Sequence, residues 1–105
     1  MKTELCNEKL PNVNIYVSAE LTGGDLKITG QDIGRYCEEF FGDSDYEYFY
    51  TFDAENTEKL FNLLLDEPAT NKLAMLKKNF NGPDCCIKLR EFCQKHSIKY
   101  SFFCY

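Results

Sequence analysis

Alternation of apolar and polar residues predicts strands in three parts of the chain. Residues 13–20 place Val13, Ile15, Val17 and Ala19 on one side and more polar residues on the other, as in a half-buried strand. Residues 22–25 contain Gly23-Gly24, which supply the positive φ angles of a tight turn, and Leu26 and Ile28 continue the pattern in a short second strand. Residues 45–53 and 98–105 alternate in the same way. The pattern therefore predicts a hairpin and two further strands.

Apolar residues at helical spacing predict four helices between or after these strands. The first runs from Asp32 to a stop at Gly42, and the second is capped by Asp53 and ends at Pro68. Pro68 suits the first turn of a third helix, and Pro83-Asp84 opens a fourth. The residues predicted to face the core are Ile33, Tyr36, Cys37, Phe40 and Phe41, then Leu60, Phe61, Leu63 and Leu64, then Leu73, Leu76 and Phe80, and last Cys86, Leu89, Phe92 and Cys93.

The order of these elements defines a fold class. The order β-β-α-β-α-α-α-β contains no regular βαβ repeat, so we expect an α+β fold with a small, largely antiparallel sheet of about four strands and helices packed against it. A chain of 105 residues has room for one domain, residues 1–105. Rings occupy both sides of residues 45–53, so this strand is expected to be central and covered on both faces.

Composition narrows the cellular setting. The N-terminal residues lack the apolar run of a signal peptide, and no stretch approaches the roughly 20 apolar residues that span a bilayer. We therefore expect a cytoplasmic protein without a membrane partner. The six cysteines are expected to be buried structural thiols, because disulfides are rare in a reducing compartment.

Charge is distributed unevenly. The net charge is −5, but residues 1–67 hold 15 acidic and 5 basic residues, whereas residues 68–105 hold 2 acidic and 7 basic residues. Residues 36–58 carry eight carboxylates, eight aromatic rings and no Lys or Arg. Tyr46, Tyr48, Tyr50 and Phe52 share one strand face and are expected to be mostly structural. The candidate binding residues that remain are Glu38, Glu39, Asp43, Asp45 and Glu47.

Templates for metal sites and catalysis fit the sequence poorly. Residues 43–47 begin like an EF-hand loop, but Tyr48 stands at the required Gly and Ala54 at the bidentate Glu. No phosphate-binding glycine loop or hydrolase motif occurs, and the basic half lacks the clustered stripe of a nucleic-acid binder. We expect no cofactor, no nucleic-acid partner and no enzymatic activity. A thiol, redox or metal protein using Cys85, Cys86, Cys93 and His96 is the alternative, with the helix dipole acting on the more exposed Cys85.

An acidic, ring-rich surface favours a basic protein partner, since carboxylates steer association and aromatic rings supply contact area. In this combination the segment resembles small intracellular inhibitors of basic enzymes, including the immunity proteins that neutralise nuclease toxins. The stretches 30–34, 45–48 and 55–60 also resemble a pattern in small bacterial proteins, which implies no function. Residues 98–105 are too apolar for an exposed edge, so they form an interior strand or pair with a second copy.

Overall fold

The computed structural model describes residues 1–34, 45–64 and 71–104. These residues form an α+β fold with a five-stranded antiparallel sheet and three helices. The strands are β1 (Lys2–Lys9), β2 (Asn14–Thr22), β3 (Asp25–Ile33), β4 (Asp45–Phe52) and β5 (Ser101–Cys104). The helices are α2 (Ala54–Leu64), α3 (Lys72–Asn79) and α4 (Cys85–Lys95). The predicted fold class and the antiparallel sheet are confirmed.

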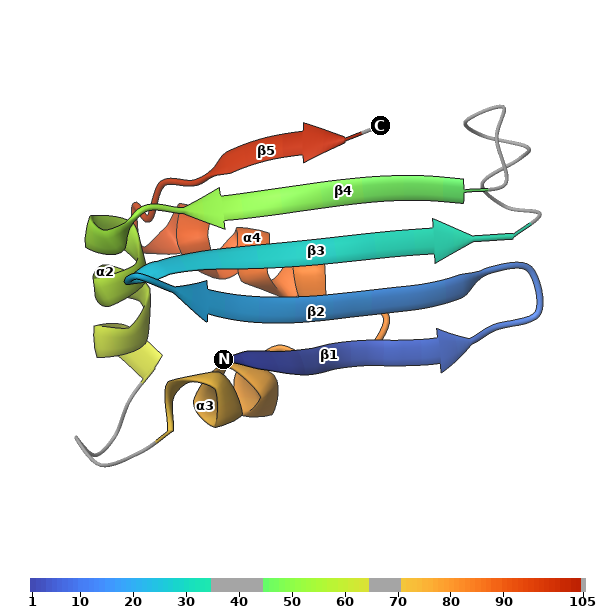
Figure 1. Ribbon diagram of the computed structural model, residues 1–105, viewed down its shortest axis with the longest axis horizontal. Coiled ribbons are helices and arrows are strands. Elements are labelled where there is room, and N and C mark those ends of the chain that lie inside the picture. Colours follow the sequence, from blue (N-terminus) through green and yellow to red (C-terminus); the bar gives the residue numbers. More distant parts are fainter. Residues whose placement is uncertain (35–44, 65–70, 105) are drawn as a thin grey trace.

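The strands follow one another across the sheet in chain order, β1-β2-β3-β4-β5 (Figure 1). The three helices lie within the connection from β4 to β5. β4 is an interior strand, as expected, but the middle of the sheet is β3. The strands β1 and β5 form the two edges, at the bottom and top of Figure 1.

The expected number of strands was wrong by one, because the alternation pattern does not reveal β1. The pairing of β1 with β2 shifts between Glu4 and Cys6, which is a bulge, and the adjacent Leu5 and Cys6 are both buried. A bulge adds one residue to a strand and so breaks the period of two. The other residues of β1 are polar, so no apolar alternation marks this strand.

The predicted start of the first helix was also wrong. Asp32 and Ile33 belong to β3 and pair with Ile15 and Asn14 of β2. Strand β3 is therefore longer than the short strand predicted from Leu26 and Ile28. Its polar residues between the apolar positions hid its full length. The rest of that predicted helix, residues 35–42, lies outside the described residues.

The turns and caps agree with the local sequence. Gly23 and Gly24 have φ angles of 58° and 91° in the turn between β2 and β3, as predicted. The Asp53 carboxylate caps α2, because its Oδ1 atom accepts a hydrogen bond of 2.9 Å from the backbone N–H of Asn56. Helix α3 begins at Lys72 and is capped by Asn71, whose side chain accepts from the backbone N–H of Ala74, so the predicted start of this helix at Pro68 was wrong. Pro68 itself lies outside the described residues.

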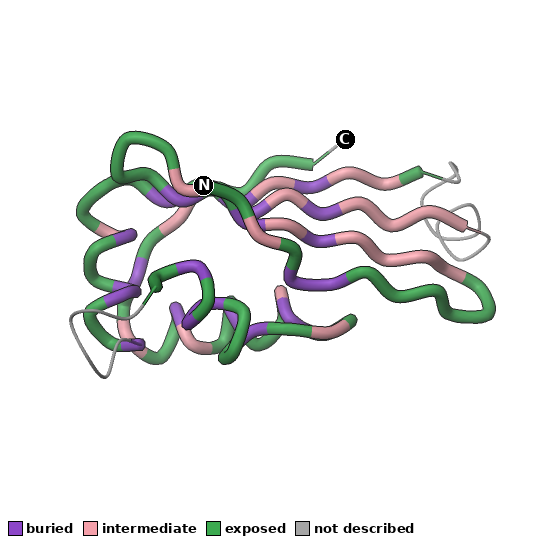
Figure 2. The backbone as a smooth tube through the Cα atoms, turned by 60° about the horizontal axis from the view of Figure 1, so that its bottom comes forward, coloured by how far each residue is buried: buried purple, intermediate pink, exposed green. Residues whose placement is uncertain are grey.

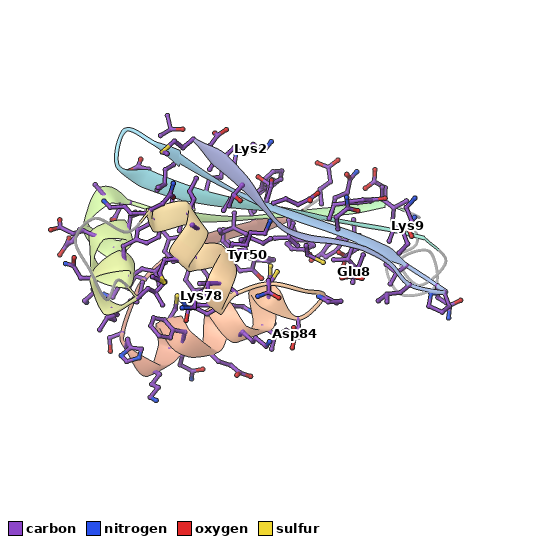
Figure 3. The ribbon with its side chains drawn as sticks, turned by 90° about the horizontal axis from the view of Figure 1, so that it is seen from below. Lys2, Glu8, Lys9, Tyr50, Lys78 and Asp84 are labelled. Carbon is purple, nitrogen blue, oxygen red and sulfur yellow. The ribbon has the colours of Figure 1, made fainter. Side chains whose placement is uncertain are left out.

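The three described helices all lie against one face of the sheet (Figures 2 and 3). We call the opposite face the open face, because no helix among residues 1–34, 45–64 and 71–104 covers it. In Figure 3, Tyr50 projects toward the helices and Lys2 toward the opposite side. The expected cover of β4 is therefore confirmed on the helix side, and no described helix supplies it on the other face. The buried residues of the core are Leu5, Cys6, Val17, Ala19, Leu26, Ile28, Tyr48, Tyr50, Phe52, Leu60, Phe61, Leu64, Leu73, Met75, Leu76, Phe80, Cys85, Leu89, Cys93 and Ile98.

Two predicted core positions on the helices differ from the structure. Leu63 is 49% exposed, because α2 turns Leu60, Phe61 and Leu64 toward the core instead. On α4, Cys85 is buried and Cys86 is only half-buried, the reverse of the predicted exposure. The predicted inward positions of α3, including Leu73 and Leu76, are confirmed.

Thr57 joins α2 to the sheet through a buried polar contact. Its hydroxyl donates a hydrogen bond of 3.2 Å to the carbonyl of Phe52 at the end of β4. The same oxygen accepts a hydrogen bond of 3.1 Å from the backbone N–H of Leu26 in β3. Buried polar groups cost stability unless they are paired, so this hydroxyl fixes where α2 meets the sheet.

Candidate functional site

The open face of the sheet carries the described part of the predicted acidic surface. Residues of a strand alternate between faces, and Tyr48, Tyr50 and Phe52 of β4 are buried on the helix side. The intervening residues of β4 therefore point to the open side, and these include Asp45, Glu47 and Phe49. Asp45 is exposed, and Glu47 and Phe49 are half-buried. A row of two carboxylates and one ring thus follows β4 on the open face.

A neighbouring side chain of β3 orients the Asp45 carboxylate. Gln31 pairs with Glu47 in the register of β3 and β4. Its Nε2 atom donates to both carboxylate oxygens of Asp45, at 3.1 Å and 3.2 Å. These two hydrogen bonds from one amide fix the orientation of the carboxylate beside β3.

Aromatic rings continue the surface from β4 to β5. The ring centroids of Phe49 and Phe103 lie 6.3 Å apart, and Phe103 is 57% exposed. On the other side of Phe49, the Lys27 ammonium lies 5.0 Å from the ring centroid. This distance allows a cation–π attraction. We call Asp45, Glu47, Phe49 and Phe103 the acidic-aromatic row.

The structure places only part of the predicted site. Asp45 and Glu47 lie two residues apart on the open face of β4, whereas Glu38, Glu39 and Asp43 lie outside the described residues. Tyr48, Tyr50 and Phe52 are core residues, as expected, and Tyr46 is half-buried. No local sequence pattern indicated that Gln31 and Phe103 belong to this site. Only the strand order brings Gln31 beside Asp45 and Phe103 beside Phe49.

A second surface feature lies across β1, β2 and β3. It is a shallow hollow of about 490 Å³, lined by Lys2, Thr3, Glu4, Cys6, Tyr16, Val17, Ser18, Thr29, Gly30 and Gln31. Its lining holds one lysine and one glutamate, so the charges balance. The hollow therefore adds uncharged hydrogen-bonding surface beside Gln31 and does not itself attract a charged ligand.

Tyr48, which is buried, and Asp32, which is half-buried, form a pair on the helix side of the sheet. The Tyr48 hydroxyl donates a hydrogen bond of 3.1 Å to Oδ1 of Asp32. Burial raises the pKa of both side chains. The Tyr48 ring packs over Gly30, its partner across the strands, where a Cβ atom would overlap the ring. This pair joins β3 to β4 and is structural.

The residues of the predicted thiol site do not lie together on α4. Hydrogen bonding between the adjacent thiols lowers the pKa of Cys85 and raises that of Cys86. Burial raises the pKa of Cys93 to about 11. Cys85 and Cys93 are about 12 Å apart along the helix, given a rise of about 1.5 Å per residue. Cys85 and Cys93 are each 1% exposed, so neither thiol is accessible in the folded protein.

His96 takes no part in a shared site with these thiols. It is the C-cap residue of α4, and its ring lies 4.4 Å from that of Phe92, centroid to centroid. Across residues 1–34, 45–64 and 71–104, no three His, Cys, Asp or Glu side chains are grouped so that they could hold a metal ion.

Comparisons with known protein families, with curated proteins and with solved structures found no match to this chain. In the part of the chain that the structure describes, no helix is long and apolar enough to cross a membrane.

Proposed function

We propose that this chain is a non-enzymatic, cytoplasmic protein-interaction domain, of the inhibitor or immunity type, that binds a basic protein partner. The acidic face consists of Asp45 and Glu47, together with Glu38, Glu39 and Asp43 of the preceding segment. The observation that carries the proposal is the acidic-aromatic row on the open face of the sheet. The free, mostly buried cysteines among the described residues support a reducing compartment.

The row combines the two components of a protein interface. Carboxylates on one face raise the association rate with a cationic partner, and salt screens that effect. The rings of Phe49 and Phe103 supply apolar contact area that becomes desolvated on binding. Strand β4 is paired with β3 and β5 and presents both components from regular secondary structure, so little order has to be gained on binding.

The proposal is tested by charge reversal with a matched control. We expect wild-type protein immobilised on beads to capture a basic protein from lysate of the cells that make it. The variant Asp45→Lys/Glu47→Lys should lose that capture, and the control Glu55→Lys/Glu58→Lys, which changes exposed acids on α2, should keep it. Against the identified partner, the first variant should slow association at least about tenfold at low salt and flatten its salt dependence. Equal capture and equal rates for both variants would contradict the proposal.

The alternative function is that of a thiol or redox protein that uses the Cys85–Cys86 pair. The lowered pKa of Cys85 favours it, and the burial of that thiol weighs against it. Timed labelling of the native protein separates the two proposals. A fast-reacting thiol that disappears in Cys85→Ser but not in Cys104→Ser would favour the redox alternative.

A further inference from the structure

The two edges of the sheet differ in how they are protected. Edge strands expose unpaired backbone groups, and proteins usually protect them with charges, bulges or Pro. Strand β1 has such protection, with Lys2, Glu4, Glu8 and Lys9 along it and a bulge near Leu5. Strand β5 has the sequence Ser-Phe-Phe-Cys and carries no charge. Among the described residues, β5 pairs only with β4.

Exposed rings flank the β5 edge on both faces of the sheet. Phe102 pairs with Tyr50 and so points to the helix side, where it is 50% exposed. Phe103 pairs with Phe49 and points to the open side, where it is 57% exposed. An uncharged edge flanked by large apolar side chains is a template for strand pairing.

We propose that β5 pairs antiparallel with β5 of a second copy, so that two sheets join into one of ten strands. A two-fold axis through this contact makes the same surface meet itself, as in the commonest type of protein dimer. Side chains directly opposite each other in an antiparallel pair share a face, so a two-fold axis at Phe103 places it opposite Phe103 of the second copy.

This register extends a contact that already exists within one copy. The Phe49–Phe103 ring pair of each copy would meet on the open face and form a row of four rings. The Lys27 side chain of each copy, which lies over Phe49, would therefore lie at each end of that row. Because β5 carries no charge, self-pairing brings no like charges together within the strand.

The acidic residues do not oppose this arrangement. In the proposed register, Glu47 of the two copies is separated by three strand spacings across the sheet and by four residues along it. With about 4.8 Å per spacing and about 3.4 Å per residue, the two positions lie roughly 20 Å apart. The Debye length at physiological salt is about 8 Å, so their repulsion is largely screened.

The size of the contact determines how the dimer should behave. Four rings, each contributing on the order of 100 Å², and a short stretch of backbone bury less than the roughly 1,200 Å² of a stable interface. We therefore expect a reversible dimer that forms at micromolar to millimolar concentration. Sedimentation equilibrium should show the mass rising toward twice 12.2 kDa with concentration.

A matched pair of substitutions tests which edge is used. Phe103→Lys adds a charge to the β5 edge and should leave a monomer at every concentration. Asn7→Lys adds the same charge to an exposed position of the β1 edge and should leave the dimer unchanged. Circular dichroism of both variants checks that the fold is kept.

Cross-linking tests the register and does not depend on the folding of Phe103→Lys. In a Cys104→Ser background, Phe103→Cys should form a covalent dimer under mild oxidation, because opposed Cα atoms about 4.5–5.5 Å apart suit a disulfide. Asn7→Cys in the same background should not. A wild-type monomer up to about 1 mM, a dimer that survives Phe103→Lys, or no cross-link at position 103 would each overturn the proposal. The proposal would also be overturned if the protein stayed monomeric and its β5 edge bound only an added peptide strand. None of these outcomes depends on the basic partner.

Discussion

Gly30 lies beneath the Tyr48 ring, and a single methyl group there should destabilise the fold. Gly30 and Tyr48 are directly paired across β3 and β4. In Gly30→Ala, the new Cβ atom would overlap Cε2 and Cζ of the ring and lie 2.7 Å from Cδ2, whereas ordinary contacts are 3.4–4 Å. The ring must therefore retreat by about 1 Å or more. That movement also strains the hydrogen bond from Tyr48 to Asp32.

The magnitude follows from three contributions. Overpacking a core costs about 1–3 kcal/mol, and losing a partly buried hydrogen bond to a carboxylate adds about 1 kcal/mol. Replacing Gly by Ala reduces the entropy of the unfolded chain and returns about 0.4–1 kcal/mol. We expect a net loss of about 2–3 kcal/mol. In a domain of this size, that loss lowers Tm by roughly 10–15 °C.

The assay is urea unfolding of four proteins in a double-mutant cycle. The cost of Gly30→Ala should be about 2–3 kcal/mol in the wild type and should vanish in a Tyr48→Val background, where no ring covers the glycine. If Gly30→Ala lay within about 0.5 kcal/mol of the wild type, or had the same cost in both backgrounds, the ring would not be what excludes a side chain at position 30.

Three further predictions concern stability and reactivity. Thr57→Val leaves the buried Leu26 N–H without its acceptor and should cost about 1–3 kcal/mol in chemical denaturation, whereas Thr57→Ser should cost about 1 kcal/mol. The hydrogen bonds that Asp53 accepts lower its pKa below 3.8, so its stabilising effect is complete above that pH and is lost as the pH falls through the folded-state value. The stability difference between the wild type and Asp53→Asn should therefore shrink between about pH 5 and pH 2 in thermal melts. In thiol labelling of the native protein, Cys104→Ser should remove one fast-reacting group, while Cys93, which is buried and has a pKa of about 11, should react only on unfolding.

The sequence predicted those elements in which one side chain in two, or one in about four, is apolar. Strand β2 and helix α2 were predicted in this way. In both, the spacing of neighbouring residues along the chain decides which side chains are buried. Strand β1 does not, since its bulge places Leu5 and Cys6 together in the core. The polar residues that extend β3 to Ile33 gave no signal either, because Asp32 is held by Tyr48 from another strand.

The candidate site was predictable to a similar extent. The carboxylates Asp45 and Glu47 stood out by charge, and their shared face follows from the period of a strand. Gln31 and Phe103 join them only through the pairing of β4 with β3 on one side and β5 on the other. Those contacts span 14 and more than 50 residues of chain, so no local pattern could reveal them.

The two proposals lead together to a bivalent surface. Joining the β5 edges would place both copies of Asp45 and Glu47 on one face of a continuous sheet, on either side of the row of rings, with the two Glu47 positions about 20 Å apart and the two Asp45 positions about 30 Å apart. A partner presented at high density would then engage both acidic sites, with an affinity raised by effective concentration. Phe103→Lys should therefore weaken binding to a densely immobilised partner far more than binding to the same partner free in solution. In solution, the variant loses only the direct contact between Phe103 and the partner. Reversal of Asp45 and Glu47 should weaken both, and the binding to the immobilised partner more strongly, because both sites of the dimer lose affinity. If Phe103→Lys weakened both measurements to the same extent, Phe103 would contact the partner directly and bivalency would not be the cause.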